Sequence, residues 1–574
     1  MGFHNRNYIR ALVMTVMASV VLAMGIVEET KSSNAKIEQM QTEESGGQEF
    51  GLYVWMNHQQ KIKSWYNQQD NSYYLFIPGA MEGKKLNLTF LGAESLSIDD
   101  RKVGNGDKCR LKEGHHIIRT GEPQDSKTYD LEVMYTSGIA SLFLETESGT
   151  LEFIHESKEN EESGSMYIMD NRGSKYYEGT IEDIHCRGNS SYEDTDKKSY
   201  SIKLSKKADL FGMGEDRKWI LTANAFDDTL LRNTIAFDIA KSLELAYTPD
   251  VEYVDVWANG AFIGNYLLSE KIEVGKNRVN IGNFEDEMME LNGNPEPETL
   301  EFFMEQQGRL FSTKGYQYEK ELNNTGGGYL LELETSDRYG LEASGFLTSR
   351  MQPVVFASPK YASYDQVSYI ANRYQDFEDA VFSEDGYSPY TGAAYSDYID
   401  MDSFARKYLV EELTKNLDAS FTSQYLYKYA DSVSEKFYAG PCWDYDKSIA
   451  ASGITEDGID LHDPNGLYAA VQEKDSDIWY ALYQHEDFRR LAAEIFFEEL
   501  EPQLKADVGE MIYGYASLIS ASNDCNMMRW NTFPQAEELS EKRELHQDKV
   551  DELVEFLDKR LDFLESEWGD LYNE

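Results

Sequence analysis

The sequence predicts an α+β protein: a two-lobed domain, with a β-rich first lobe and a helical second lobe, preceded by a small all-β module. Two observations predict this class. From residue 50 to about residue 335, short runs of β-branched and aromatic residues alternate with turn residues. From Met401 onward, apolar residues recur at helical spacing. The 574 residues allow about two to four domains at roughly 150 residues each.

The N-terminus has the pattern of an export signal. Arg6 and Arg10 precede an apolar run, residues 11–27. Its length lies between a signal-peptide core of roughly 7–15 residues and a spanning helix of about 20. Ala-Met-Gly at 23–25 offers a cleavage site, so the pattern favours a cleaved signal peptide over an uncleaved anchor within residues 1–27. We therefore expect a secreted or cell-surface protein that touches a membrane only through such an anchor.

A polar linker and a β module are expected next. Residues 28–49 are rich in Ser, Glu and Gln and poor in aromatic residues, which is typical of a disordered linker. In residues 50–134, runs such as SYYLFIP and LNLTFLG alternate with turn residues, which predicts an antiparallel β module. The two-lobed domain should then occupy residues 135–574, with its lobes at about 135–335 and 336–574.

The first lobe should contain eight strands and one helix. The strands are IASLFLETES, MYIMD, EDIHCRG, YSIKL, KWILTAN, VEYVDVWANG, AFIGNYLLSEKI and GGGYLLELE. Asn259 and Gly260 predict a tight hairpin turn. Asp228 is placed to cap a helix on which Leu231, Ile235, Ile239 and Leu243 share one face. The acidic stretch 284–324 indicates a loop-rich insertion.

The second lobe should be built from amphipathic helices. Residues 401–417 place Phe404, Tyr408 and Leu413 on one face. Several helices should follow from about residue 476. The last of them has helically spaced leucines at 553, 557, 561 and 564.

Composition excludes some classes of function. Lys+Arg 54 against Asp+Glu 103 gives a net charge of −49, which argues against nucleic-acid binding and favours cationic partners. The four cysteines (Cys109, Cys186, Cys442 and Cys525) form no CxxC pair, and the nine histidines show no HExxH spacing. Zinc and a dense disulfide framework are therefore not indicated, although one or two disulfides stay open.

A turn of small residues in the first lobe could hold an anion. Gly188, Asn189, Ser190 and Ser191 follow Arg187. Backbone N–H groups in such a turn, with a neighbouring guanidinium, can bind phosphate. Most glycine turns are only turns, so the signal is weak by itself.

The strand YSIKL supplies a lysine after this turn. Tyr200, Ile202 and Leu204 share one face of the strand, and Lys203 lies on the other. If the apolar face packs on the core, Lys203 points either to solvent or into a cleft.

A predicted hairpin in the second lobe should bring carboxylates together. Strand 424–429, turn 430–435 and strand 436–438 form its arms. Asp418 lies fourteen residues before Ser432 and Asp444 lies twelve after it. Near-equal arms place Asp418 and Asp444 side by side, with Asp446 two residues on.

Adjacent carboxylates that face an anion-binding turn suit phosphoryl transfer. One carboxylate holds Mg²⁺, another orients the acceptor hydroxyl, and cations neutralise the phosphates. Taken singly, these aspartates are more often turn caps. Asp444-Tyr445-Asp446 also has the DxD pattern of a metal-dependent glycosyltransferase.

Several of these stretches together resemble the CotH kinase family. They are RGNSSYEDTDKKSYSIKL, LFGMGEDRKWILTANAFDDTLLRN, NGAFIGNYLLSEKIEVGKNRVNI, GGGYLLELE, NLDASFTSQYLYKY and AGPCWDYDKS, in this order within residues 139–448. The resemblance implies an atypical protein-kinase-like fold and a serine/threonine protein kinase that uses ATP and Mg²⁺ or Mn²⁺. It also implies a secreted protein substrate, with the spore coat as one setting.

The resemblance assigns roles to individual residues. Asp418 is similar to the catalytic aspartate, and Asp444 to a metal-binding aspartate with Asp446 as its rival. Arg187 to Ser191 resemble the phosphate loop, and Lys203 the phosphate-contacting lysine. Trp443 and Tyr266 are candidates to contact adenine, and Glu270 falls near the expected hinge between the lobes.

Two positions depart from a kinase pattern. A kinase catalytic loop has a metal-binding Asn five residues after its Asp, where this chain has Ser423. A hydroxyl is a weaker metal ligand than an amide carbonyl. The helix glutamate that usually pairs with the kinase lysine has only Asp238 as a candidate. The alternatives to an active kinase are a pseudokinase or adhesive surface protein and, behind it, a glycosyltransferase. For the kinase we expect a basic, Ser-rich protein substrate.

Overall fold

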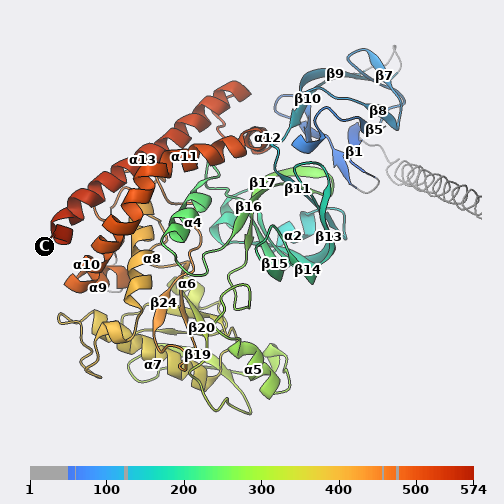
Figure 1. Ribbon diagram of the computed structural model, residues 1–574. Helices are drawn as coiled ribbons and strands as arrows, with labels where there is room; N and C mark the ends of the chain where they lie inside the picture. The colour runs from blue at the N-terminus through green and yellow to red at the C-terminus, as the bar shows by residue number, and fades with distance from the viewer. Residues whose placement is uncertain (1–49, 58–59, 122–126, 456–457, 473–476, 574) are drawn as a thin grey trace, which may run out of the picture. The chain divides into compact units, whose positions relative to one another are not determined.

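The structure is a computed structural model that describes residues 50–57, 60–121, 127–455, 458–472 and 477–573 (Figure 1). The predicted signal segment, 1–27, and the predicted linker, 28–49, lie outside the described residues. The chain is mixed α+β, as its sequence predicts. It divides into two compact units: described residues up to Gly138 with 171–173 and 257–262, and the rest. Within the described ranges, no helix combines the length and apolarity needed to cross a bilayer.

The first unit contains two β-sheets. One has the strand order β2-β1-β5-β8, and the other has the order β3-β4-β10-β9-β6-β7. Their elements are β1 (Gly51–Trp55), β2 (Lys61–Lys63), β3 (Trp65–Asn67), β4 (Ser72–Ile77), η1 (Gly79–Met81), β5 (Leu86–Leu91), β6 (Leu96–Ile98), β7 (Arg101–Val103), β8 (Asp107–Cys109), β9 (Gly114–Thr120) and β10 (Lys127–Tyr135).

One pairing in this unit corrects the expectation of a purely antiparallel module. Strand β10 pairs in parallel with β4 and antiparallel with β9. The intervening strands form a long crossover, which a parallel pair requires.

The turn predicted at Asn259 and Gly260 is confirmed, because both residues have positive φ angles of 51° and 82°.

The second unit begins with a closed seven-stranded barrel of order β11-β12-β13-β14-β15-β17-β16. All seven strands expected between residues 139 and 270 are present. The elements are β11 (Ala140–Thr146), α2 (Glu152–Glu156), β12 (Glu161–Met169), β13 (Lys175–Arg187), α3 (Ser190–Asp194), β14 (Ser199–Asp209), β15 (Glu215–Thr222), α4 (Arg232–Ser242), β16 (Val251–Ala258) and β17 (Ala261–Glu270).

Helix α4 begins at Arg232, later than the sequence suggested, and Asp227 occupies the capping role predicted for Asp228. The Asp227 carboxylate accepts hydrogen bonds from the backbone N–H groups of Thr229 and Arg232 at 2.9 and 2.8 Å. Leu230 has a φ of 65°, which turns the chain before the helix starts. Asp227 therefore reaches the first helical N–H across this turn, and Asp228 remains exposed.

A seven-stranded sheet of order β18-β19-β21-β22-β20-β23-β24 follows the barrel. The strand predicted from GGGYLLELE is β20, and it pairs with β22 and β23, not with barrel strands. The elements are α5 (Phe284–Leu291), η2 (Pro297–Thr299), β18 (Glu301–Glu305), β19 (Ser312–Gln317), β20 (Tyr329–Leu333), α6 (Ser336–Tyr339), β21 (Gly345–Leu347), β22 (Pro353–Ser358), α7 (Tyr364–Val381), β23 (Gln424–Lys428) and β24 (Phe437–Ala439).

The loop-rich insertion expected at 284–324 is wrong in its main feature, because this stretch contains α5, β18 and β19. This stretch is acidic, but a few of its apolar residues have the spacing of a helix and a strand. Phe284 and Met288 are one helical turn apart and are buried, as is Phe303 in the centre of β18.

The remaining helices, apart from α12, contribute buried residues to a common core with the sheet. They are η3 (Tyr395–Asp397), α8 (Met401–Thr414), η4 (Ala469–Val471), α9 (Ile478–Tyr483), α10 (Glu486–Ile495), the π-helical turn η5 (Phe496–Leu500), α11 (Glu501–Leu518), α12 (Ser520–Trp530) and α13 (Leu539–Asn573). The four leucines predicted to share a face of α13 are fully buried. Helix α8 ends before residue 417 because Lys415 has a φ of 46°. All four cysteines are free thiols.

Candidate functional site

A cavity of about 350 Å³ lies between barrel residues on one side and the seven-stranded sheet and its loops on the other. Ten of the thirteen residues that the sequence nominated line it. They are Arg187, Gly188, Asn189, Ser190, Ser191, Asp418, Ser423, Trp443, Asp444 and Asp446. They come from chain segments more than two hundred residues apart.

The predicted hairpin brings Asp418 and Asp444 to this cavity. Strands β23 and β24 are antiparallel, with Leu426 opposite Ala439 and Lys428 opposite Phe437. Beyond the strands the two arms stay together, because the Leu417 N–H donates to the Lys447 carbonyl at 3.2 Å. The loops that carry both aspartates are thus adjacent, as their near-equal distances from the turn predict, although Lys447 and not Asp444 is the residue bonded across from Leu417.

The three aspartates form a crowded negative cluster. Burial, and next the charge of Asp444, raise the pKa of Asp418 to about 7. Burial also raises the pKa of Asp444, against the opposing effect of Arg187. The pKa of Asp446 lies well above its ordinary value because of burial and then the charge of Asp444. Carboxylates that resist ionisation together fit a divalent cation, which would remove their mutual repulsion.

Other ligands would have to complete the coordination of an ion bound at these aspartates. In the described ranges, the sole group of three potential ligand atoms within 4.8 Å of one another is Glu161, Asp183 and His185, outside the cavity. The three cavity aspartates therefore do not all reach one ion from their present positions. Mg²⁺ commonly uses one or two carboxylates and fills its other positions with water and phosphate oxygens.

Ser423 lies beside Asp444, at the position where a kinase has asparagine. Its side chain hydrogen-bonds the Asp444 carboxylate, and this bond opposes the burial that raises the pKa of that group. Its own backbone is left-handed, with a φ of 56°. The hydroxyl therefore orients a carboxylate that could bind metal, and its own use as a metal ligand is not required.

The Arg187–Ser191 turn closes the opposite side of the cavity. Gly188 has a φ of 92°, and a Cβ placed there would lie 2.1 Å from the Ser191 hydroxyl, so the turn requires glycine. Lys158 ties the turn down by donating to the Gly188 carbonyl at 3.0 Å and to Asn189 Oδ1 at 2.9 Å. Helix α3 starts at Ser190, and its first N–H groups have no partner within the helix.

Arg187 and Trp443 lie against each other across the cavity. The guanidinium carbon is 4.9 Å from the centroid of the indole. Burial lowers the pKa of Arg187, and the charge of Asp444 counteracts this effect. Phe237 also packs near Trp443, at a centroid distance of 6.4 Å. An adenine ring at this wall would therefore share the indole with Arg187.

Three nominated residues are absent from the lining of this cavity in the described chain, and Lys203 is the most consequential. Ser199 lines the cavity, and Lys203 lies four residues further along β14, about 13 Å away at 3.3 Å per residue. Its ammonium pairs instead with Glu182 at 2.5 Å, and the lysine is partly exposed. The Lys203 ammonium therefore lies away from the cavity that holds the other residues predicted to contact phosphate.

Tyr266 and Glu270 on β17 are also placed elsewhere. Leu267 and Ser269 line the cavity, so the alternation of the strand turns Tyr266 to the opposite face. There the Tyr266 hydroxyl donates to the Lys198 carbonyl at 3.0 Å. Glu270 pairs with Arg278 at 2.6 Å.

Asp238 does not reach Lys203 either. Its carboxylate accepts a hydrogen bond from the Tyr515 hydroxyl at 2.5 Å. The helix carboxylate expected to pair with the lysine is therefore engaged with α11.

The structure adds a cation that sequence reasoning missed. Lys447 follows Asp446 directly, lines the cavity, and lies 3.4 Å from the Ser190 hydroxyl and 4.1 Å from the centroid of Phe226. It thus reaches from the aspartate loop to the Arg187–Ser191 turn. The sequence feature that could have identified this cation is the lysine directly after Asp444-Tyr445-Asp446.

Two further carboxylates come from β20. Glu332 and Glu334 line the cavity, and burial, then the charge of Glu334, raise the pKa of Glu332 to about 8. Their period-two spacing in an otherwise apolar strand was visible in YLLELE. Asn224 and Asn233 also line the cavity, from the barrel side.

Comparison with known proteins identifies the family. The model of the CotH kinase protein family matches residues 184–564, which is more than half of the chain and includes every residue of the cavity. A comparison with curated proteins finds no match. The chain belongs to the CotH kinase family.

Proposed function

We propose that this chain is an ATP-dependent protein serine/threonine kinase that requires Mg²⁺ or Mn²⁺ and acts outside the cytoplasm. One observation carries the proposal. The β23–β24 hairpin holds Asp418 beside Asp444 and Asp446, and this cluster faces the Arg187–Ser191 turn in a single cavity. Together these are the carboxylates and anion-binding groups that phosphoryl transfer needs.

The residues divide into three roles. Asp444 and Asp446 would hold the divalent ion, which when bound neutralises phosphate charge. Arg187, Lys447 and the N–H groups at Ser190 would contact phosphate oxygens. Asp418, with its pKa raised to about 7, suits the acceptance of the proton that leaves the acceptor hydroxyl.

The charges around the cavity support metal-dependent nucleotide binding. Six carboxylates line it (Glu332, Glu334, Asp337, Asp418, Asp444 and Asp446), against three cations (Arg187, Arg338 and Lys447) among the described residues. Where these carboxylates are ionised, an anionic nucleotide alone would be repelled by this excess. We therefore propose that ATP binds only together with the cation.

The net charge of −49 favours a substrate rich in Lys and Arg. We propose an extracytoplasmic, Ser-rich basic protein as the substrate, in keeping with a spore-coat setting. The export pattern in residues 1–27 supports this location. Fractionation and N-terminal sequencing test it, because cleavage after residue 25 leaves Ile26 as the first residue.

Nucleotide or metal binding without transfer is the second candidate. It is favoured by Lys203, which lies outside the cavity, and by Ser423, which replaces the expected amide. Lys447 offers the transfer reaction an alternative cation, so we place the kinase first.

The deciding experiment combines binding with transfer. ATP and Mg²⁺ together should raise the melting temperature, and mass spectrometry should detect phosphoserine on the protein or on a basic serine peptide. Asp418→Ala should still bind ATP but lose turnover by about 10²–10⁴-fold. Asp444→Ala should lose metal-dependent binding as well. Binding without transfer in the wild type would establish the second candidate, and wild-type turnover in both variants would place the chemistry elsewhere.

A further inference from the structure

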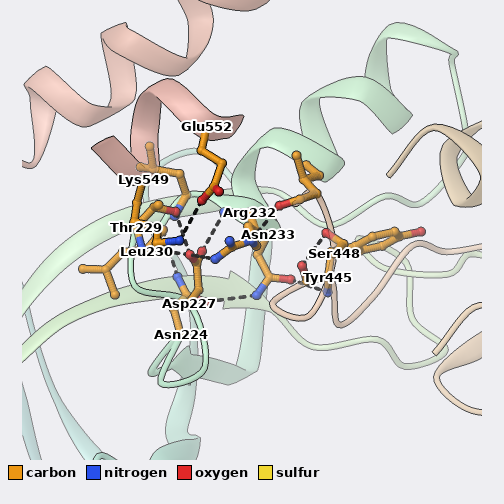
Figure 2. Close-up of polar contacts among 12 residues, drawn as sticks. Asn224, Asp227, Thr229, Leu230, Arg232, Asn233, Tyr445, Ser448, Lys549 and Glu552 are labelled. Atoms are coloured by element: carbon orange, nitrogen blue, oxygen red, sulfur yellow. Dashed lines mark hydrogen bonds and ion pairs between the residues drawn. The ribbon is translucent and has the colours of Figure 1, made fainter. Parts of the chain in front are cut away.

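Tyr445, which lies between Asp444 and Asp446, is held at three points, and Figure 2 shows two of them, the contacts with Asn233 and Ser448. Its backbone N–H donates to Asn233 Oδ1 at 2.7 Å. Its carbonyl accepts from the Ser448 hydroxyl at 2.6 Å. Its buried phenol donates to Glu411 of α8 at 2.6 Å. The side chains of Asp444 and Asp446 therefore project from a stretch of backbone that has little freedom to rotate.

Asn233 is itself buried, with 3% of its surface exposed. Its Nδ2 donates to Asn224 Oδ1 at 2.9 Å, and Asn224 Nδ2 donates to the Leu230 carbonyl at 3.2 Å. Both ends of the Asn233 amide thus have protein partners, which hold the side chain in its present orientation. Asn233 contacts the loop of residues 444–449 through the Tyr445 N–H.

The preceding residue of α4 holds the far end of the same loop. Arg232 Nε donates to the Ile449 carbonyl at 3.0 Å, and the guanidinium pairs with Asp227 at 2.5 Å (Figure 2). The first turn of α4 thus contacts the loop at both Tyr445 and Ile449. These are the contacts by which a barrel-side helix can determine where the aspartates lie.

The loop needs such support. Asp444, Ile449 and Ala450 all have left-handed backbones, with φ angles of 65°, 38° and 56°. Residues with side chains adopt this region at a cost, and they stay there only when surrounding contacts require it. The repulsion among the cavity carboxylates also disfavours this loop conformation, because it favours their separation.

We propose that Asn233 is a positioning residue. By accepting the Tyr445 N–H, it sets the directions of the Asp444 and Asp446 carboxylates, and so it controls divalent-cation affinity without touching the ion. The inference rests on the proposed metal site. It adds that α4 and metal binding are coupled, so that a displacement of α4 weakens the site.

Mn²⁺ titration of the whole protein, without nucleotide, tests the proposal. Asn233→Leu removes the acceptor with little change in volume, and its Mn²⁺ dissociation constant should rise by about 10–100-fold, as for other groups that orient metal ligands. Asn233→Asp keeps an acceptor for the Tyr445 N–H and should restore part of the affinity. Asn233→Ser is too short to reach the loop and should behave like Asn233→Leu if the latter does not fold.

Thr234→Val is the matched control. Thr234 is the next residue of α4, is equally buried, and donates to the Tyr253 hydroxyl at 2.9 Å, away from the loop. The variant loses one buried hydrogen bond and should be less stable. Its Mn²⁺ affinity should stay within about twofold of wild type, as expected for an independent site.

Asp444→Ala distinguishes an incorrect metal site from an incorrect positioning role for Asn233. If wild type does not bind Mn²⁺, or Asp444→Ala binds it equally well, the metal site itself is wrong. If Asp444→Ala loses binding but both Asn233→Leu and Asn233→Ser retain wild-type affinity, the positioning role is wrong. If Asn233 acts by positioning Asp444 and Asp446, adding Asn233→Leu to Asp444→Ala weakens Mn²⁺ binding no further.

Discussion

The guanidinium carbon of Arg187 lies 4.9 Å from the centroid of the Trp443 ring, which joins the end of barrel strand β13 to the aspartate loop. Burial raises the pKa of the Asp444 carboxyl, and Arg187 lies close enough to oppose this rise. One side chain thus contacts the aromatic wall of the cavity, affects a candidate metal ligand, and begins the anion-binding turn.

Replacing this guanidinium should reduce nucleotide affinity more than stability. Arg187→Lys keeps the charge but loses the planar fork and its stacking on Trp443, so the dissociation constant for Mg²⁺–ATP should rise about tenfold. Isothermal titration measures this change. Trp443→Phe, which keeps an aromatic face, is the control and should have the smaller effect. Equal affinity in wild type and Arg187→Lys would remove Arg187 from the phosphate site.

The two lysines should differ sharply. Lys447→Ala removes the cation between the aspartate loop and the Arg187–Ser191 turn, so kcat/KM should fall by at least about tenfold. Lys203→Ala breaks a partly exposed pair with Glu182 and should change kcat/KM by less than about threefold. Steady-state kinetics of both variants decides between them. A larger loss in Lys203→Ala would restore the assignment made from sequence.

Metal stabilisation should depend on pH. The folded-state pKa of Asp418, about 7, lies above its ordinary value of 3.8, so this group favours folding less as pH rises from about 4 to 7. Asp444 and Asp446 shift in the same direction. A divalent cation binds the ionised forms, so the rise in melting temperature produced by Mg²⁺ should grow between pH 5 and pH 8. Differential scanning calorimetry measures it, with Asp444→Ala as control. A constant Mg²⁺ effect across this range would contradict a carboxylate metal site.

The surface charge should select basic substrates at low salt. Of two matched serine peptides, the Lys/Arg-rich one should have the higher kcat/KM, since a negative surface speeds its encounter. Its advantage should shrink near 0.15 M salt, where the Debye length is about 8 Å. Equal rates for the acidic and basic peptides at every salt concentration would assign the charge to solubility.

Local pattern determined much of this protein. Period-two runs specified the barrel strands, and Asn259-Gly260 specified its hairpin turn, because these depend on neighbouring residues alone. The adjacency of the loops that carry Asp418 and Asp444 was also predictable, since a hairpin with near-equal arms needs only sequence distances. Strands and a helix in the acidic stretch 284–324 were missed because few of its residues are apolar.

Tertiary structure decided which lysine lines the cavity. Lys203 has the expected sequence context, but the length of β14 carries it away, whereas Lys447 reaches the turn only because the aspartate loop folds under it. The contacts of Asn233 and Arg232 with the Asp444–Ile449 loop join residues more than two hundred positions apart. No local pattern encodes such contacts, because their free energy depends on the packing of the barrel-side helix against a distant loop.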